Sequence, residues 1–346
     1  MGLVCSLFAL VGNRCSGPDG TISHKTSGIE IGQKGFKDGI HEFAIDPRDI
    51  EVCVLRRLWR RFIQVDQDIL LGRGACGIVS RGIHIPTGTL LAIKAVQVNE
   101  RGKREQLMND IQALIKAQSC AYLVQLYAAY YHRQSGRVHV ALELMDMGSL
   151  QDFLKRTRNS PIPENFIAVI AFQVLKGLEF LHAHKQLHRD IKPGNILLNS
   201  DGAVKLSDFG ISKSLDNTAN ICDTFVGTAT YMSPERAVGH DYSFSADVWS
   251  FGMVLYEMAT GQHPFPSTSS FPVLFDCLCT KPEPRLSSLF SPDLCELVQL
   301  CLSRDPLNRP SVSQLLGRDY FHRLNDPNLM DSFRYWLHHS RTYSHV

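Results

Sequence analysis

LHRDIKPGN, residues 187–195, places three polar side chains of different chemistry within a few positions. Asp190 is an acid placed to accept a proton from an attacking hydroxyl, and Lys192 can neutralise charge on a phosphoryl group during its transfer. Asn195 offers a neutral oxygen, which is one of the ligand types that Mg²⁺ prefers. Each residue alone could be an ordinary polar residue, but together they predict a site for phosphoryl transfer.

A second motif, LSDFG (206–210), follows the first along the chain. Its Asp208 supplies a carboxylate that can bridge a metal ion and phosphate oxygens. The two motifs together therefore predict that Asn195 and Asp208 hold a metal ion bound to phosphates.

LGRGACGIV (71–79) lies upstream of both motifs and has the spacing G-x-G-x-x-G. Glycines in such a loop let backbone amides approach phosphate oxygens without a Cβ in the way. Alone the pattern is a weak signal, because dinucleotide-binding folds and ordinary hairpins share it. A dinucleotide site needs a helix directly after the glycines, whereas here a second strand-like run follows and brings Lys94. That order favours a lid over a nucleotide, with the lysine reaching its α- and β-phosphates.

The apolar pattern changes along the chain from strand-like to helical. Short β-type runs lie between Val65 and Val98, a helix is expected over 104–117, and the strand-like runs VQLYAAYY and VHVALEL follow. The sequence predicts a small sheet-rich lobe followed by a larger helical lobe, an α+β arrangement. The helices expected after Gly148 cover 149–157, 164–183, 245–260 and 292–302.

Composition limits the function classes. With 346 residues, 44% of them hydrophobic and 20% charged, the chain is expected to form one large two-lobed unit or two domains. A net charge of +2 gives no general attraction to nucleic acid. The ten cysteines form no paired C-x-x-C blocks, which argues against a zinc site or a disulfide framework and for a reducing compartment. No apolar run approaches the roughly 18 residues that span a bilayer.

The motifs GRGACG, AIK, HRDIKPGN, DFG and SPE occur in this order, and on them the sequence resembles the eukaryotic protein kinases over residues 66–322. The resemblance implies a bilobal fold with an N-lobe at 66–143 and a C-lobe at 146–322, followed by a tail at 323–346. It implies ATP and Mg²⁺ as cofactors, and Leu142 as the gatekeeper residue. The nucleotide-binding residues that it implies are Leu71, Gly72, Gly74, Gly77, Val79, Ala92, Lys94, Glu143, Met145, Ser149 and Asp152.

Further roles carry over from the same resemblance. Glu143 and Met145 would give the hinge backbone contacts to adenine. Asp247 of ADVWSFG is similar to the buried aspartate with which the family holds the backbone of its catalytic loop. Arg309 of DPLNRPS is similar to the buried partner of Glu235.

Three more stretches narrow the family. LMDMGSLQDFL (144–154), FVGTATYMSPER (225–236) and FDCLCTKPEPRL (275–286) are similar to MAP kinase kinases. Those enzymes phosphorylate a Thr and a Tyr in the activation loop of a MAP kinase. The resemblance implies a MAP kinase as substrate and a MAP kinase kinase kinase as activator.

Asp110 departs from the pattern of the family. Active kinases pair the strand lysine, here Lys94, with a glutamate on the next helix, and KREQLMNDIQAL (103–114) has Asp110 at that position. Aspartate is one methylene shorter, so the ion pair needs an inward movement of the helix, a water bridge, or a helix that swings out in the resting form. Glu105 is the other candidate, but its spacing from the lysine is too short. This weakens an expectation of high basal activity, while the other predicted catalytic residues are intact.

TANICDTFVGTATYMSPE (218–235) is rich in hydroxyl side chains. By resemblance Thr228 would hydrogen-bond the catalytic acid and lysine and shape the substrate pocket. Tyr231 and Ser233 would form a wall in which an added phosphate would disrupt packing. Thr230 has no assigned role.

Two threonines of the same stretch are predicted phosphorylation switches. Thr224 lies where MAP kinase kinases carry their second activating phosphosite, and Thr218 precedes it with five intervening residues, a spacing like that of the plant members. Arg189, next to the catalytic acid, could pair with phosphorylated Thr224 and order the loop. The alternative for both is an ordinary exposed loop threonine.

The N-terminus predicts acylation. MGLVCS (1–6) fits the acceptor pattern for myristoylation at Gly2, and Cys5 would carry a second acyl chain, which stable anchoring needs. A signal peptide and a chance match are the alternatives. Residues 1–50 are expected to be a mobile leader. The protein is expected in the cytoplasm, anchored to the cytoplasmic face of a membrane if it is acylated.

A basic amphipathic segment at 51–65 follows the leader. Within LRRLWRRFI (55–63) the apolar residues and the arginines occupy separate arcs of a helix. Such a helix could lie on an anionic membrane, contact an acidic partner, or pack on the folded domain.

Two other readings of function compete with an active MAP kinase kinase. One is a membrane-tethered scaffold or pseudokinase, which Asp110 alone favours, and the other is a general Ser/Thr kinase. FHRLNDPNLMDSFRYWLHHS (321–340) could dock an activator or be a helix packed on the large lobe. Cys76 and Cys222 could be oxidised, although inert cysteines are the default.

Overall fold

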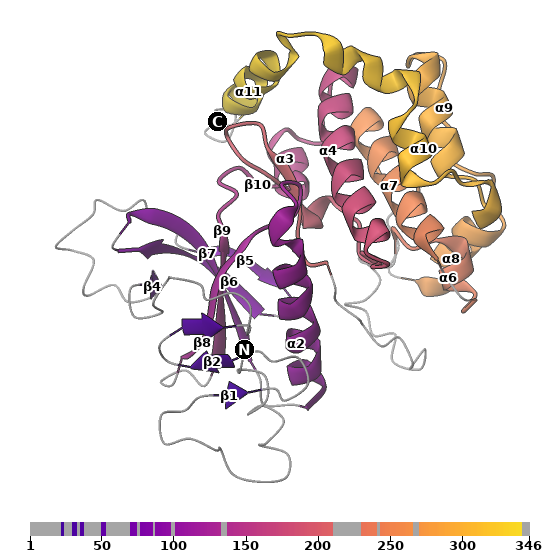
Figure 1. The fold of residues 1–346 in the computed structure, drawn as a ribbon. Coiled ribbons are helices and arrows are strands. Elements are labelled where there is room, and N and C mark those ends of the chain that lie inside the picture. Colours follow the sequence, from indigo (N-terminus) through magenta and orange to yellow (C-terminus); the bar gives the residue numbers. More distant parts are fainter. Residues whose placement is uncertain are drawn as a thin grey trace. The chain divides into compact units, whose positions relative to one another are not determined.

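The computed structural model describes residues 22–23, 30–32, 35–37, 50–52, 70–74, 77–85, 87–97, 101–132, 137–209, 230–240, 243–265 and 270–340. The chain divides into two compact units, a small one of residues 1–119 with 124–145 and a large one of residues 120–123 with 146–346. The small unit is mainly sheet and the large unit is mainly helical (Figure 1).

The small unit is built on an antiparallel sheet with the strand order β4-β6-β7-β9-β8, in which β5 also pairs with β6. Along much of β6 and β7, buried residues alternate with less buried ones, because successive side chains of a strand point to opposite faces. The strand-like runs predicted from the sequence are confirmed. The strands are β4 (Ile50–Val52), β5 (Leu70–Gly74), β6 (Gly77–His84), β7 (Thr89–Gln97), β8 (Leu126–His132) and β9 (Arg137–Glu143).

One long helix, α2 (Arg101–Lys116), belongs to the small unit and continues into the 3₁₀ turn η3 (Ala117–Ser119). Leu107 and Ile111 lie four residues apart, about one helical turn, and both are buried. The helix expected over 104–117 is therefore present, with one face packed inward.

Short strands also occur in the residues expected to form a mobile leader. β1 (Ile22–Ser23), β2 (Glu30–Gly32) and β3 (Gly35–Lys37) pair antiparallel, and β4 joins the main sheet beside β6. Backbone pairing of this kind needs no apolar periodicity, which is why the sequence did not reveal it. The basic amphipathic segment 55–63 lies outside the described residues.

The large unit carries its helices around α4. The helices predicted after Gly148 are confirmed to within about one residue at either end. The elements are α3 (Leu150–Arg156), α4 (Glu164–Ala183), α6 (Pro234–Ala237), α7 (Phe244–Thr260), α8 (Phe271–Cys279), α9 (Pro292–Cys301), α10 (Val312–Leu316), α11 (Leu329–Ser340), the 3₁₀ turns η4 (Pro193–Asn195), η6 (Pro306–Asn308) and η7 (Asp319–Asn325), and the strands β10 (Gly148–Ser149), β11 (Ile196–Leu198) and β12 (Val204–Leu206).

Helix α4 forms the core of the large unit. Among the described residues it is the one helix long and apolar enough to cross a membrane, and more than half of that stretch is buried inside the protein. A helix that is apolar on most sides is typical of the centre of a large helical domain. Helix α7 packs on α9 so closely that a Cβ on Gly252 would lie 2.6 Å from Cβ of Cys301, which explains the glycine.

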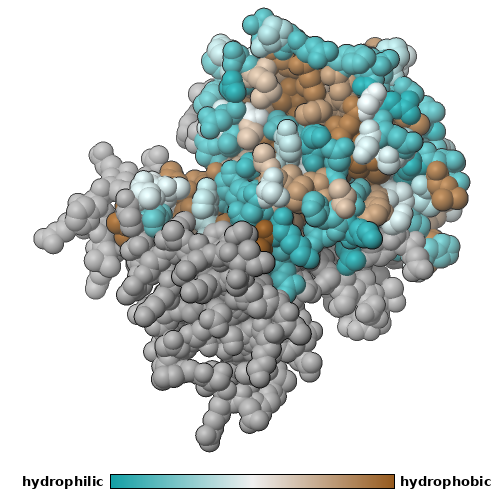
Figure 2. Space-filling model, in the orientation of Figure 1, coloured by the Kyte–Doolittle hydropathy of each residue, from teal (hydrophilic) through white to brown (hydrophobic). Residues whose placement is uncertain are grey.

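The C-terminal helix α11 packs on the large unit. Phe333 and Leu337 are fully buried, and the ring of Trp336 lies 4.9 Å from Phe166 of α4 and 4.8 Å from Phe153 of α3. Of the two alternatives for the segment 321–340, the structure therefore has the packed helix for its second half. An apolar area framed by hydrophilic side chains lies between α11 and α9 on the surface (Figure 2).

Candidate active site

A buried aspartate holds the backbone of the loop that contains Asp190. The carboxylate of Asp247, at the start of α7, accepts hydrogen bonds from the backbone N–H of His188 (2.9 Å) and of Arg189 (2.8 Å). The Nε2 atom of His182 lies 2.9 Å from the same carboxylate. The role predicted for Asp247 is confirmed, and three groups satisfy a charge that is almost completely buried.

The pKa shifts of Asp247 and His188 depend on their burial and on their hydrogen bonds. Burial alone would raise the pKa of Asp247, but the hydrogen bonds from the His182 side chain and from the His188 backbone help to lower it overall. Burial also lowers the pKa of His188, against the opposing effect of Asp247, so its imidazole is neutral near pH 7. The loop is thus held by a carboxylate that stays ionised.

Asp190 lies at the centre of a hydrogen-bonded set in this loop. Lys192 Nζ donates to Asp190 Oδ2 at 2.9 Å. Asn195 Nδ2 donates both to that oxygen, at 2.9 Å, and to the backbone carbonyl of Asp190, at 2.7 Å. The structure therefore brings together the proposed base, the proposed phosphate-neutralising lysine and one proposed metal ligand.

The arrangement of Asn195 and Asp208 suits a divalent cation. The Asn195 amide nitrogen is turned to Asp190, so its oxygen is the atom left to face a cation. β11 begins directly after Asn195, β12 ends two residues before Asp208, and Ser207 N–H donates to the Asn195 carbonyl at 2.9 Å. Asp208 has a φ of 56°, a strained value of the kind that clusters at functional sites.

The described residues include no group of three or more His, Cys, Asp or Glu side chains that could hold a metal by themselves. Mg²⁺ is usually bound through one or two carboxylates together with phosphate oxygens and water. The pair of Asn195 and Asp208 therefore fits a cation that arrives with a nucleotide.

The glycine-rich stretch forms the hairpin of β5 and β6, in which Gly74 pairs with Gly77. Gly77 has a φ of 142°, and a Cβ there would lie 2.3 Å from the carbonyl oxygen of Ala95. Only glycine fits this position. Val79 pairs across β6 and β7 with Lys94, while Leu71 is half-exposed and Gly72 has open space around it.

The predicted hinge follows β9. Leu142 pairs with Ala92 of β7, and the Glu143 N–H donates to the Gln125 carbonyl at 2.9 Å. The boundary between the two units falls directly after Met145. A chain segment that ends one compact unit and begins the next is where a hinge is expected.

Ser149 and Asp152, both predicted to bind nucleotide, form the capping box of α3. Ser149 Oγ accepts from the Asp152 N–H at 3.1 Å, and Asp152 Oδ2 accepts from the Ser149 N–H at 3.2 Å. The sequence reasoning missed this local function, although the Ser-x-x-Asp spacing carries its signal.

Asp110 lies on α2 beside the fully buried Ile111 and is itself partly buried. It belongs to the small unit, as Lys94 does. The predicted ion pair between them stays a prediction.

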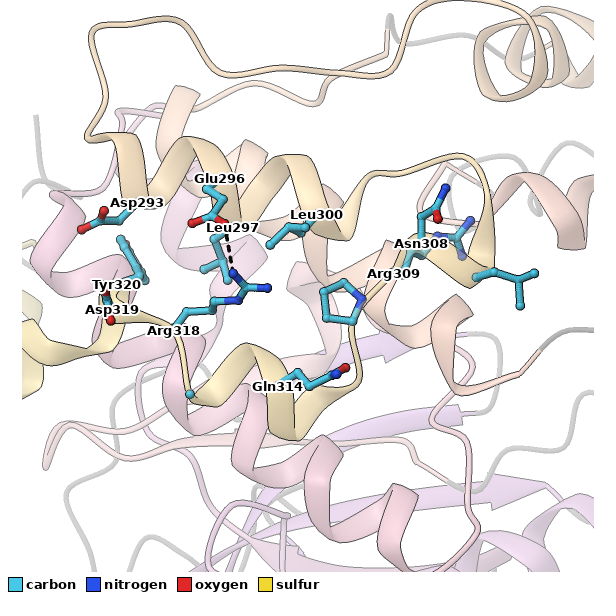
Figure 3. Close-up of a pocket in the computed structure, with 13 residues that line it drawn as sticks. Asp293, Glu296, Leu297, Leu300, Asn308, Arg309, Gln314, Arg318, Asp319 and Tyr320 are labelled. Atoms are coloured by element: carbon cyan, nitrogen blue, oxygen red, sulfur yellow. Dashed lines mark hydrogen bonds and ion pairs between the residues drawn. The ribbon is translucent and has the colours of Figure 1, made fainter.

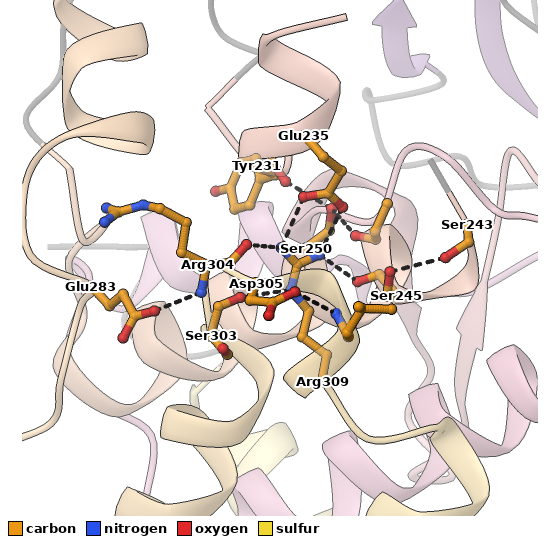
Figure 4. Close-up of polar contacts among 12 residues, drawn as sticks. Tyr231, Glu235, Ser243, Ser245, Ser250, Glu283, Ser303, Arg304, Asp305 and Arg309 are labelled. Atoms are coloured by element: carbon orange, nitrogen blue, oxygen red, sulfur yellow. Dashed lines mark hydrogen bonds and ion pairs between the residues drawn. The ribbon is translucent and has the colours of Figure 1, made fainter. Parts of the chain in front are cut away.

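Arg309 and Glu235 form a buried pair, as predicted (Figure 4). Arg309 Nη1 and Nη2 donate to the two carboxylate oxygens at 2.7 and 2.8 Å. The remaining donors reach the backbone carbonyls of Ser303, Ser245 and Arg304 at 2.8 to 3.0 Å. All five guanidinium N–H groups are therefore used.

The ionisation of Glu235 follows from this pairing. Burial would raise the pKa of Glu235, but the hydrogen bonds and charge of Arg309 lower it overall. Glu235 therefore stays an anion inside the protein.

The wall predicted around Tyr231 is well packed. The Tyr231 hydroxyl donates to Glu257 at 2.5 Å, and Ser250 Oγ donates to the Tyr231 carbonyl at 2.7 Å. Ser233 is completely buried ahead of α6, and burial raises the pKa of the Tyr231 phenol. A phosphate on either hydroxyl would have to displace this packing.

Several predicted residues lie outside the described part of the chain. They are Gly2, Cys5, Cys76, Thr218, Cys222, Thr224 and Thr228. Arg189, the proposed partner of phosphorylated Thr224, is described: it has a φ of 69°, and its carbonyl accepts from Arg236 Nη1 at 2.9 Å.

Sequence reasoning missed His182 and Arg236, which support the loop from α4 and α6. No local pattern marks them, because each acts on a residue far away in the sequence. A separate hollow of about 640 Å³ lies between α9 and α10 and contains none of the predicted catalytic or nucleotide-binding residues (Figure 3). The ion pair of Arg318 and Glu296, at 3.0 Å, crosses it.

Comparisons with known proteins agree with this site. A family model for the protein kinase domain matches residues 65–321. The chain is 42% identical to mitogen-activated protein kinase kinase 3 of Arabidopsis thaliana over 72% of its own length and 48% of the relative. It is 40% identical to mitogen-activated protein kinase kinase 1c of Physcomitrium patens over 74% and 76% of the two chains.

A third relative is dual specificity mitogen-activated protein kinase kinase 1 of Dictyostelium discoideum, 44% identical over 57% of this chain and 30% of that one. The chain thus spans about half the length of the Arabidopsis relative and about three quarters of the moss relative. The matched residues include both motifs that surround Asp190 and Asp208. The chain belongs to the MAP kinase kinase family and is an ATP-dependent protein kinase that uses a divalent metal ion.

Proposed function

We propose that this kinase phosphorylates the threonine and the tyrosine in the activation loop of a MAP kinase, with Mg²⁺ and ATP, and that a MAP kinase kinase kinase activates it. The observation that carries the proposal is the set of hydrogen bonds from Lys192 and Asn195 to Asp190 in a chain of this family. The name of the Dictyostelium relative, which includes dual specificity, supports the choice of substrate residues.

The chemistry divides among the side chains of the loop. Asp190 orients the attacking hydroxyl and takes its proton, and Lys192 neutralises charge on the transferring phosphoryl group. Asn195 and Asp208 would hold the metal ion, which when bound supplies positive charge to the phosphates. Lys94 would hold the α- and β-phosphates. Because this reaction depends mainly on positioning and charge neutralisation, the order of the loop controls its rate.

Phosphorylation of Thr218 and Thr224 would switch the enzyme on, and Thr228 would brace the catalytic loop. The support is the position of Arg189, whose N–H is fixed by Asp247 and whose carbonyl is fixed by Arg236. A phosphate paired with this anchored arginine would order the segment that carries it.

We also propose that this kinase is cytoplasmic and that acylation at Gly2 and Cys5 attaches it to a membrane. The sequence pattern alone supports it. Myristate labelling of the full chain and of Gly2→Ala tests it: label that persists in the variant contradicts the proposal.

The main test uses recombinant full-length protein and MAP kinases whose own catalytic aspartate has been replaced. The Thr218→Asp/Thr224→Asp variant is expected to label the MAP kinase faster than the wild type, and the same variant with Asp190→Asn is expected to be inactive. Label that survives Asp190→Asn removes the catalytic assignment. The absence of stimulation by the acidic pair removes the switch, provided that labelling by an upstream kinase fails to stimulate as well.

A further inference from the structure

His263, between α7 and α8, is a half-buried titratable residue without a part in the mechanism above. Its ring lies 5.1 Å from the ring of Tyr231 in an edge-to-face arrangement of 85°. Its Nδ1 atom contacts the backbone of Phe265, whose N–H lies 3.2 Å away. Its Nε2 atom is buried and has no partner at hydrogen-bond geometry among the described residues.

This environment is unusual for an imidazole. Burial lowers the pKa of His263, and the backbone of Phe265, the carboxylate of Glu257 and the backbone of Thr230 only partly oppose it. Burying a polar ring nitrogen without a good partner lowers stability, and a buried orphan of this kind calls for an explanation. A phenylalanine ring would fill the same space without that penalty.

The interactions of His263 converge on the segment Thr230–Ser233. The charge of Glu257 raises the pKa of His263, and the same carboxylate accepts the hydrogen bond of the Tyr231 hydroxyl at 2.5 Å. The edge-to-face contact between the rings of His263 and Tyr231 favours one orientation of the Tyr231 side chain. The ring of His263 thus contacts the side chain of Tyr231 directly.

The same segment is connected to the catalytic loop within the large unit. Ser233 leads directly into α6, and Arg236 of that helix donates to the Arg189 carbonyl at 2.9 Å. Arg189 is followed by Asp190. A displacement of the segment would therefore alter the surface presented to the hydroxyl that reacts at Asp190.

We propose that His263 is a positioning residue for protein-substrate recognition, which holds the segment Thr230–Ser233 in place through its ring contact with Tyr231. The choice of a MAP kinase as its substrate rests on the function proposed above. The inference concerns the affinity for the protein substrate and not the affinity for ATP.

The test compares full-length wild type with His263→Gln, which removes the ring, and with His263→Phe, which keeps an aromatic ring against Tyr231. Steady-state rates are measured with a catalytically inactive MAP kinase and with myelin basic protein, at saturating ATP and over a range of ATP. We expect KM for the protein substrate to rise about 3- to 10-fold in His263→Gln and to stay within about twofold of wild type in His263→Phe, because only the first variant loses the edge-to-face contact. We expect kcat and KM for ATP to stay within about twofold of wild type in both variants, and the thermal midpoint of His263→Phe to be unchanged or higher. His338→Gln, an exposed histidine of α11, is the control and should change none of these quantities.

Two further results complete the test. If His263 acts through Tyr231, His263→Gln should add nothing in KM to a Tyr231→Leu variant, because the interaction is already lost. The proposal is overturned if KM for protein is unchanged in His263→Gln or rises equally in both His263 variants. It is also overturned if kcat, KM and the thermal midpoint all worsen together, which a purely structural role predicts. Labelling of myelin basic protein without labelling of any MAP kinase would contradict the proposed function alone, and the His263 comparison would then be made on the basic protein.

Discussion

Two ion pairs of the large unit have nearly the same length but different surroundings. Arg309 and Glu235 are joined at 2.7 Å with side chains that are 0% and 8% exposed. Lys192 and Asp190 are joined at 2.9 Å with side chains that are 23% and 15% exposed. The first pair also uses every donor of its guanidinium on protein acceptors, whereas the second retains contact with solvent.

The difference in burial distinguishes a structural ion pair from a catalytic one. A fully buried, fully paired charge cannot accept a new partner without losing an old one, so it fixes backbone segments relative to one another. A partly exposed charge can exchange its partner for a substrate group. The first pair should therefore control stability, and the second should control turnover.

The largest effect is expected from Asp190→Asn. Removing a general base lowers turnover by about 10²- to 10⁴-fold. Folding should be nearly unchanged, because asparagine has a shape similar to that of aspartate and Asp190 is partly exposed. Initial rates of phosphate transfer and urea unfolding of the same preparation measure both quantities. A variant that loses stability together with activity would show that Asp190 stabilises the fold, as Arg309 and Glu235 do.

Arg309→Met should give the opposite result. It leaves Glu235 buried without its partner, which typically lowers the free energy of unfolding by about 3–5 kcal/mol. Urea unfolding of the full-length protein measures the loss of stability. Activity at low temperature should fall much less than it does in Asp190→Asn. Wild-type stability in this variant would contradict the importance of the buried pair.

We expect acid to lower the stability of the folded protein, beginning just below neutral pH. The pKa values of His188, Asp247 and Glu235 are all lower in the folded protein than their ordinary values of 6.5, 3.8 and 4.5. The unfolded chain then binds more protons as pH falls, so stability declines below about pH 6.5 through His188 and again below about pH 4.5 through the carboxylates. Urea midpoints measured at pH 7.5, 5.5 and 4.0 should decrease in that order, and a constant midpoint would refute the shifts.

The smallest effect is expected from Arg318→Met. Its pair with Glu296, at 3.0 Å, has side chains that are 39% and 58% exposed. Exposed pairs of this kind contribute only about 0–1 kcal/mol, because water and salt screen them. Unfolding under the conditions used for Arg309→Met makes the comparison direct: equal losses in the two variants would mean that burial does not separate them.

Much of the fold could be predicted because its signals are local. The 20 residues of α4 form an apolar run with a helical pattern, and its bounds were predicted without error. Asp247 and Arg309 were assigned correctly because short motifs surround them. The β5–β6 hairpin followed from the glycine spacing, and Gly77 shows the steric reason for it.

The rest depends on contacts between distant residues. His182 and Asp247 are 65 positions apart, and the contact of Glu164 with Ser291 at the start of α9 joins residues 127 positions apart. No periodicity or spacing marks such pairs, because packing of the helices creates them. His263 was missed for the same reason, because the ring that it contacts belongs to Tyr231, much earlier in the sequence.

If the loop around Asp190 carries a MAP kinase kinase activity, the protein phosphorylates both the threonine and the tyrosine of a MAP kinase activation loop. The most direct measurement is mass-spectrometric mapping of an inactive MAP kinase after incubation with the activated protein, Mg²⁺ and ATP. We expect a peptide of the MAP kinase activation loop that carries phosphate on both threonine and tyrosine, and we expect this peptide to be absent when Asp190 is replaced by Asn. Phosphate on threonine alone, or equal labelling by the Asp190→Asn variant, would contradict it.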